Sequence, residues 1–92
     1  VGALRRLDAE TGEVKSMRTH PDHLGKGVGS AVLAEIMAAA RAAGLRRLSL
    51  ETGTGPAFEP AIALYKRRGF VFGRPFGDYV ETDFNVYLHL EL

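Results

Sequence analysis

The chain has 92 residues, of which 46% are hydrophobic and 25% charged, and its formal net charge is +1. This length suits one small globular domain, and the balanced charge gives no general reason to expect a nucleic acid or an anionic membrane as a partner. The chain has no cysteine, which excludes disulfides, thiolate nucleophiles and cysteine-based metal sites. It carries neither a signal-peptide pattern nor an apolar run near the ~20 residues of a membrane span, so we expect a cytoplasmic protein.

The chain is expected to begin with a β-hairpin. Val1–Leu7 has strand character, the polar run Asp8–Gly12 is typical of a hairpin loop, and a second strand follows over about Glu13–Thr19. Pro21 ends this strand because it cannot donate to a strand ladder. Since Val1 is not a Met and already has strand character, we expect a single domain, residues 1–92, that is truncated at its N-terminus. The first strand would then be open to pairing with a second copy, as a homodimer.

A long helix is predicted over about Gly27–Ala43, ended by Gly44 at the C′ position. Its apolar residues recur at helical spacing and share one face, namely Val28, Val32, Leu33, Ile36, Met37 and Ala40. The short strand Arg46–Glu51 follows. A strand, a helix and a strand of these lengths predict a βαβ unit with two parallel strands.

The second half of the chain is expected to hold one short helix and two strands. The helix spans about Glu59–Arg68 and follows a loop over Thr52–Pro56. After the helix come the brief strand Phe70–Phe72 and a second loop, Gly73–Thr82. The last strand alternates, with Phe84, Val86, Leu88, Leu90 and Leu92 on one face and Asn85, Tyr87 and His89 on the other. The predicted fold class is α/β, with a mixed, mostly antiparallel sheet.

Three alternating glycines, Gly25, Gly27 and Gly29, lie in the stretch His23–Ser30 just before the long helix. Glycines let several backbone N–H groups turn toward one point, where the helix adds its own unpaired N–H groups and the positive end of its dipole. The stretch therefore predicts an anion site, most often for phosphate, although a flexible glycine turn is the alternative. It is not a P-loop, because Lys26 is followed by glycine, and it lacks the Gly-x-Gly-x-x-Gly spacing of dinucleotide folds.

A second motif, Ala61–Phe70, reads Ala-Ile-Ala-Leu-Tyr-Lys-Arg-Arg-Gly-Phe. Together the two segments resemble the GNAT superfamily of acyl-CoA-dependent N-acetyltransferases. That family has a pyrophosphate motif (Gln/Arg)-x-x-Gly-x-(Gly/Ala) and a helix with Ala-x-x-Leu-Tyr-x-x-x-Gly-Phe. Leu24 stands in the Gln/Arg place, and Phe58 stands where many members have Asn. The resemblance covers nearly all of the chain, corresponds to the C-terminal part of the family domain, and points to a bacterial branch of small acetyltransferases.

The resemblance implies a GNAT-like fold splayed near the glycines, acetyl-CoA as cofactor, and acetyl transfer to a primary amine of a small molecule or peptide. Backbone groups implied to hold the cofactor are Met17, Arg18 and Thr19 at the pantetheine arm, and Leu24, Gly25, Lys26, Gly27, Val28, Gly29 and Ser30 at the pyrophosphate. Tyr65 would face the thioester sulfur.

The chemistry needs a donor near the departing thiolate and a base for the acceptor ammonium. With reference pKa values of about 10 for tyrosine and 8.5 for a thiol, full proton transfer from Tyr65 is uphill by roughly 2 kcal/mol. A stabilising hydrogen bond therefore suits Tyr65 at least as well, and a core aromatic is its alternative role. Glu51 is the candidate base. The alternative is that Glu51 is only an exposed carboxylate at the end of a strand, in which case the base lies outside this chain or acts through a water molecule. Without cysteine, direct attack in a ternary complex is expected.

Other functions can be weighed on the remaining polar clusters. His20, Asp22 and His23 sit in a Pro-containing turn without further ligands at suitable spacing, so no metal is predicted. Two basic groups, Arg46–Arg47 and Lys66–Arg68, could in principle meet RNA, but no aromatic residues interleave with them to stack on bases. We therefore expect these groups to be solvated, with a contact to the 3′-phosphate of the cofactor as the alternative. The competing functions are a non-catalytic CoA- or nucleotide-binding module and a structural interaction domain.

Overall fold

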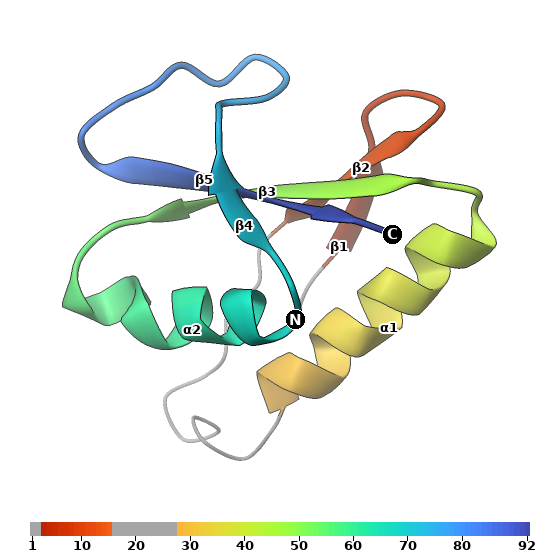
Figure 1. Ribbon diagram of the computed structural model, residues 1–92, viewed down its shortest axis with the longest axis horizontal. Helices are drawn as coiled ribbons and strands as arrows, with labels where there is room; N and C mark the ends of the chain where they lie inside the picture. The colour runs from red at the N-terminus through yellow and green to blue at the C-terminus, as the bar shows by residue number, and fades with distance from the viewer. Residues whose placement is uncertain (1–2, 16–27) are drawn as a thin grey trace.

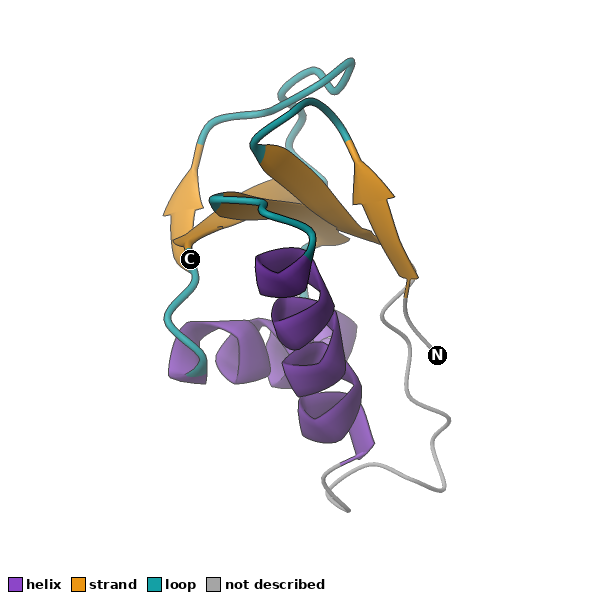
Figure 2. Ribbon diagram, turned by 90° about the vertical axis from the view of Figure 1, so that its right-hand side faces the viewer, coloured by secondary structure: helices purple, strands orange, loops and turns teal. Residues whose placement is uncertain are grey.

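A computed structural model describes residues 3–15 and 28–92, which form a sheet with both helices on one face (Figure 1 and Figure 2). The elements in chain order are β1 (Ala3–Arg6), β2 (Thr11–Lys15), α1 (Val28–Ala42), β3 (Arg47–Gly53), the 3-10 helix η2 (Pro56–Phe58), α2 (Glu59–Arg67), β4 (Val71–Gly73) and β5 (Asn85–Glu91). Neither of the two described α-helices combines the length and the hydropathy needed to cross a membrane.

The described strands lie in the order β1-β2-β3-β5-β4. Strands β2 and β3 pair in parallel, whereas the other three described pairs are antiparallel. This confirms the predicted βαβ unit and the mixed, mostly antiparallel sheet. Among the described residues, the last pair of β2 with β3 is Val14 with Leu50, whereas β3 continues to Gly53 alongside Asn85 of β5. Within the part of the chain that the structure describes, β2 and β3 therefore part after that pair, and we call this place the split.

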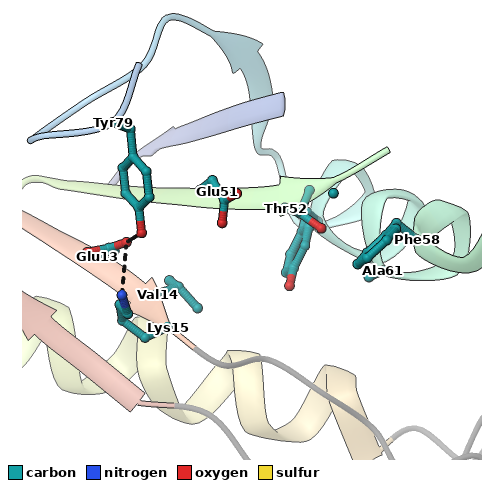
Figure 3. A pocket seen from close by; sticks show the side chains of 10 residues that line it. Glu13, Val14, Lys15, Glu51, Thr52, Phe58, Ala61 and Tyr79 are labelled. Carbon is teal, nitrogen blue, oxygen red and sulfur yellow. Dashed lines mark hydrogen bonds and ion pairs between the residues drawn. The ribbon is translucent and has the colours of Figure 1, made fainter. Parts of the chain in front are cut away.

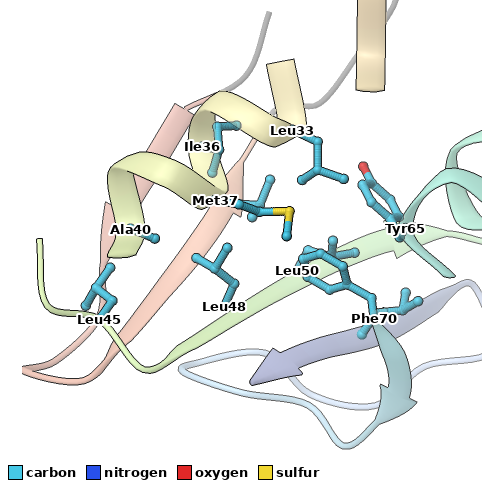
Figure 4. Packing of buried hydrophobic residues seen from close by; sticks show 11 residues of the cluster. Leu33, Ile36, Met37, Ala40, Leu45, Leu48, Leu50, Tyr65 and Phe70 are labelled. Atoms are coloured by element: carbon cyan, nitrogen blue, oxygen red, sulfur yellow. The ribbon is translucent and has the colours of Figure 1, made fainter. Parts of the chain in front are cut away.

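Helix α1 covers the sheet with the face that its apolar spacing predicts. Leu33, Ile36, Met37 and Ala40 are buried and pack over β3 (Figure 4). The helix is closed by Gly44, whose φ of 79° is the left-handed conformation of a C′ glycine. The predicted helix and its stop are thus confirmed within the described residues.

Leu48→Ala should lower the free energy of unfolding by about 2–5 kcal/mol, because Leu48 is completely buried beneath α1 and its truncation leaves a cavity. Urea unfolding measures the change. Val80→Ala is the matched control: Val80 is 74% exposed, so its truncation should change the free energy of unfolding by less than about 0.5 kcal/mol. Equal losses in the two variants would contradict the placement of Leu48 in the core.

The face of the sheet opposite the helices is covered by the loop 74–84, drawn above the sheet in Figure 1. Tyr87 and His89 point to this face, as the alternation of the last strand predicts, and both are buried. The Phe76 ring lies 6.0 Å from the Tyr87 ring and 5.8 Å from the His89 ring, centroid to centroid. The loop therefore gives the sheet a second, aromatic layer.

Several predicted boundaries are wrong: β2 begins at Thr11, inside the predicted hairpin loop Asp8–Gly12, and β4 includes Gly73, which was expected in a loop. Two further differences show the physical reason. Phe84 was expected to open the last strand on its apolar face, but β5 begins at Asn85 and Phe84 is 77% exposed. Its amide donates to the Thr82 hydroxyl at 3.2 Å, which holds Phe84 in the turn before the strand. The third strand was expected to end at Glu51, but it continues to Gly53 because Thr52 and Gly53 pair with β5. Long-range pairing thus overrides the loop character of these two residues.

Candidate active site

A pocket of about 480 Å³ lies where β2 and β3 part (Figure 3). The residues that line it are Glu13, Val14, Lys15, Glu51, Thr52, Gly53, Phe58, Ala61, Tyr65 and Tyr79. Side chains alternate along a strand, so Glu13 and Glu51 point to the loop side of the sheet while Val14 and Thr52 point to the helix side. The pocket is therefore lined from both faces of the sheet, through the split.

Tyr65 of α2 forms part of the helix side of the pocket. It is 4% exposed, and its ring centroid lies 5.8 Å from that of Phe70 (Figure 4). Tyr65 is thus a core aromatic and also a pocket residue, so the two roles weighed from the sequence are compatible. Burial raises the pKa of the Tyr65 hydroxyl above its usual value of about 10. Proton transfer to a thiolate therefore becomes more uphill, and hydrogen-bond donation is favoured.

Phe58 closes the pocket beside the end of β3. A Cβ atom on Gly53 would lie only 2.6 Å from the Phe58 ring, so the ring packs directly on the glycine backbone. Phe58 takes the place where the family motif often has Asn. Instead of a side-chain amide, this position provides an aromatic wall.

Glu13 of β2 supplies a buried carboxylate on the loop side, with only 3% of the residue exposed. Its Oε2 accepts a hydrogen bond from the Tyr79 hydroxyl at 2.7 Å and lies 3.8 Å from the Lys15 ammonium (Figure 3). The hydrogen bond to Glu13, followed by desolvation, raises the pKa of Tyr79 to about 12. Tyr79 therefore stays protonated and donates to Glu13 at neutral pH.

Glu51 lies near Glu13 on the neighbouring strand. It is half-buried rather than exposed, it sits within β3 rather than at its end, and it accepts a hydrogen bond from the Asn85 side-chain amide. The alternative of an exposed strand-end carboxylate is thus wrong. The pocket brings Glu51 together with Tyr65, the other predicted catalytic residue.

The first turn of α1 holds the described part of the predicted anion site. Gly29 and Ser30 lie in this turn, after Val28 begins the helix. The guanidinium group of Arg68, just after α2, donates a hydrogen bond to the Ser30 hydroxyl. A positive side chain thus reinforces the positive end of the helix dipole. The other predicted cofactor-binding residues lie outside the described residues, namely Met17, Arg18, Thr19, Leu24, Gly25, Lys26 and Gly27, as do His20, Asp22 and His23.

Sequence reasoning missed Glu13, Lys15 and Tyr79. Glu13 has the sequence pattern of an ordinary strand residue, and its burial depends on the loop that folds over it. Tyr79 lies 66 positions further along the chain, so only the folded sheet brings the two together. Within residues 3–15 and 28–92, no three His, Asp or Glu side chains are grouped closely enough to hold a metal ion.

Comparison with known proteins identifies the family. The family model "Acetyltransferase (GNAT) family" matches residues 1–70. The uncharacterized N-acetyltransferase YsnE of Bacillus subtilis (strain 168) is 48% identical over 91 residues, which cover 99% of this chain and 60% of YsnE. The uncharacterized N-acetyltransferase YedL of Escherichia coli (strain K12) is 45% identical over 92 residues, which cover 100% of this chain and 58% of YedL. The chain thus spans about three-fifths of the length of these relatives.

Solved structures agree with this assignment. An acetyltransferase from Streptococcus agalactiae 2603 is 26% identical with a TM-score of 0.84, covering 99% of this chain and 58% of the other. A GNAT family acetyltransferase from Elizabethkingia anophelis, solved with acetyl-CoA bound, is 21% identical with a TM-score of 0.80. The match covers 99% of this chain and 67% of the Elizabethkingia chain. The latter shows a common fold. With the family model matching more than two-thirds of its residues, the chain belongs to the GNAT family of acetyltransferases.

Proposed function

We propose that the protein transfers an acetyl group from acetyl-CoA to a primary amine of a small molecule or peptide, by direct attack in a ternary complex. The observation that carries this proposal is the pocket at the split between β2 and β3. It holds a buried phenol, Tyr65, on the helix side and two carboxylates, Glu13 and Glu51, on the loop side. Membership of the family and the acetyl-CoA bound to the Elizabethkingia relative support the same proposal.

The described residues at the start of α1 suit the phosphates of an anionic cofactor. Gly29 and Ser30 offer the N-terminal turn of a 15-residue helix, and Arg68 adds a positive side chain there. We place the pyrophosphate at this turn and the pantetheine arm along the split between β2 and β3. When bound, acetyl-CoA supplies the activated acetyl group.

The chain's own residues accept the proton of the amine and donate a hydrogen bond to the sulfur. An acceptor amine reaches the site as an ammonium ion and must lose a proton before its nitrogen can attack. Glu51 and Glu13 present carboxylates to the pocket, and we assign proton acceptance to them. Tyr65 donates a hydrogen bond toward the sulfur, and its raised pKa keeps the hydroxyl protonated. The nitrogen loses two protons in all: the first, from the ammonium ion, passes by way of a carboxylate to solvent, and the second, lost after the nitrogen has attacked, balances the proton that the thiol product gains.

Arg68→Glu should weaken acetyl-CoA binding about tenfold, because it reverses the charge beside the first turn of α1. Arg67→Glu makes the same change of charge one residue away, in α2, and should have little effect. Isothermal titration calorimetry at low salt compares the two dissociation constants with that of the wild type. Equal affinities for all three proteins would place the phosphates elsewhere.

The direct test of the proposed function is turnover. The protein is incubated with acetyl-CoA and a panel of primary amines, and the release of free thiol is followed. Thiol release that depends on the amine supports acetyl transfer. Binding of acetyl-CoA without release for any amine would instead identify a CoA-binding module, and failure to bind would favour a structural interaction domain.

A further inference from the structure

Three polar residues form one row across the loop side of the sheet. Glu13 of β2 pairs in register with Ser49 of β3, and Ser49 pairs with His89 of β5. All three are buried, although they face away from the apolar core under the helices. Their burial is due to the loop 74–84, which lies over this face (Figure 1). A buried polar row needs hydrogen-bond partners, and the loop provides them at both ends.

At one end of the row, the loop is fixed to His89. The His89 Nε2–H donates to the Arg74 carbonyl oxygen at 2.8 Å, because a carbonyl can only accept. The other ring nitrogen, Nδ1, lies 2.7 Å from the Ser49 hydroxyl, which donates to it when the ring is neutral. This end of the row therefore anchors the loop and makes no contact with the pocket.

At the other end, Tyr79 reaches from the loop to Glu13 inside the pocket, at 2.7 Å. The Tyr79 ring is held by two neighbours, the Phe76 ring at 5.1 Å edge-on and the Tyr87 ring at 5.8 Å. The Tyr87 hydroxyl in turn donates to the Val80 carbonyl at 2.8 Å, which fixes the loop just after Tyr79. The phenol of Tyr79 thus has a defined direction before any ligand binds.

We propose that Tyr79 is a positioning residue, which orients the Glu13 carboxylate as the proton acceptor for the acceptor amine. This inference rests on the proposed function, and it assigns a role in that site to the loop 74–84. Because both described contacts of Glu13 use Oε2, the phenol sets the rotation of the carboxylate. The Lys15 ammonium attracts the same carboxylate but orients it less, since it lies 3.8 Å from Oε2, beyond hydrogen-bond distance.

Charged groups around Tyr79 determine how it titrates. Glu13 and, more weakly, Glu51 raise the pKa of Tyr79, whereas Arg5 lowers it. The net result, about 12, exceeds the ordinary value near 10. The donated hydrogen bond therefore persists at neutral pH and is lost only as the pH rises through about 12.

The first arm of the test needs no turnover. The ultraviolet absorbance of tyrosinate is recorded against pH for the wild type and for Glu13→Gln. We expect the highest of the three tyrosine steps to move from about 12 toward 10 in Glu13→Gln, and to be missing in Tyr79→Phe. An unchanged highest step in Glu13→Gln would overturn the contact between Tyr79 and Glu13. Because no acetyl-CoA is used, this arm decides the contact even where the proposed function fails.

The second arm separates positioning from simple support of the loop. Tyr79→Phe should lower kcat about tenfold with little change in the KM for acetyl-CoA, because the carboxylate loses its direction while the cofactor site is intact. Tyr87→Phe is the matched control, since it also removes one phenol that holds this loop but leaves the bond to Glu13. Its kcat should fall much less than that of Tyr79→Phe, because the Tyr79 hydroxyl still donates to Glu13. Equal losses in the two variants would overturn the positioning role, whereas inactivity of the wild type would overturn the proposed function itself.

Discussion

Tyr65→Phe should lower kcat for acetyl transfer about 100-fold while leaving the dissociation constant for acetyl-CoA nearly unchanged. The substitution removes only the hydroxyl group that we place near the sulfur. The ring remains in the core beside Phe70, so the pocket keeps its shape. Steady-state kinetics at saturating acetyl-CoA and amine give kcat, and calorimetry gives the dissociation constant.

Stability provides the control for this variant. Urea unfolding should show that Tyr65→Phe retains most of its free energy of unfolding, so that a slower reaction reports on chemistry rather than on folding. An unchanged kcat would remove Tyr65 from the mechanism and leave it as a core aromatic. A large rise in the dissociation constant would instead make its hydroxyl a binding group.

Ala61→Phe should weaken acetyl-CoA binding about 100-fold, which corresponds to ~2.7 kcal/mol. Ala61 lines the helix side of the pocket next to Phe58 (Figure 3), and a phenyl ring at this position would occupy the space that we assign to the cofactor arm. Calorimetric titration with acetyl-CoA measures the loss.

Ala63→Phe is the matched control for this block. It introduces the same ring on the same helix two positions later, at an exposed residue that does not line the pocket. Its affinity for acetyl-CoA should match the wild type. If Ala61→Phe bound as tightly as Ala63→Phe, acetyl-CoA would not occupy this pocket.

Local patterns predicted the parts of the fold in which nearby residues decide the structure. The helical spacing of Leu33, Ile36 and Ala40 indicated the buried face of α1, and Gly44 indicated its end. The same reasoning failed at Thr52 and Gly53, because their pairing with β5 depends on residues more than 30 positions away. Exposed Phe84 shows the converse, since an alternating pattern continued into a turn.

The candidate site divides in the same way. Tyr65 and Glu51 were predicted, one from a helix motif and one from its place on a strand, and the pocket brings them together. Glu13 and Tyr79 were not, because their contact exists only once the loop 74–84 crosses the sheet. Because β2 contains several polar residues, its sequence does not indicate that the carboxylate of one of them is buried. What identifies it is the residue that hydrogen-bonds to it from a distant loop.

In the proposed function, acetyl-CoA binds at the split between β2 and β3, with its phosphates at the start of α1. The most direct measurement is the backbone amide NMR spectrum of the protein titrated with acetyl-CoA to about 1 mM, which would detect even a weak complex. We predict that the perturbed amides cluster at residues 13–15, 51–53, 29–30 and Tyr65. An unchanged spectrum, or changes confined to the outer strands β1 and β4, would contradict the claim.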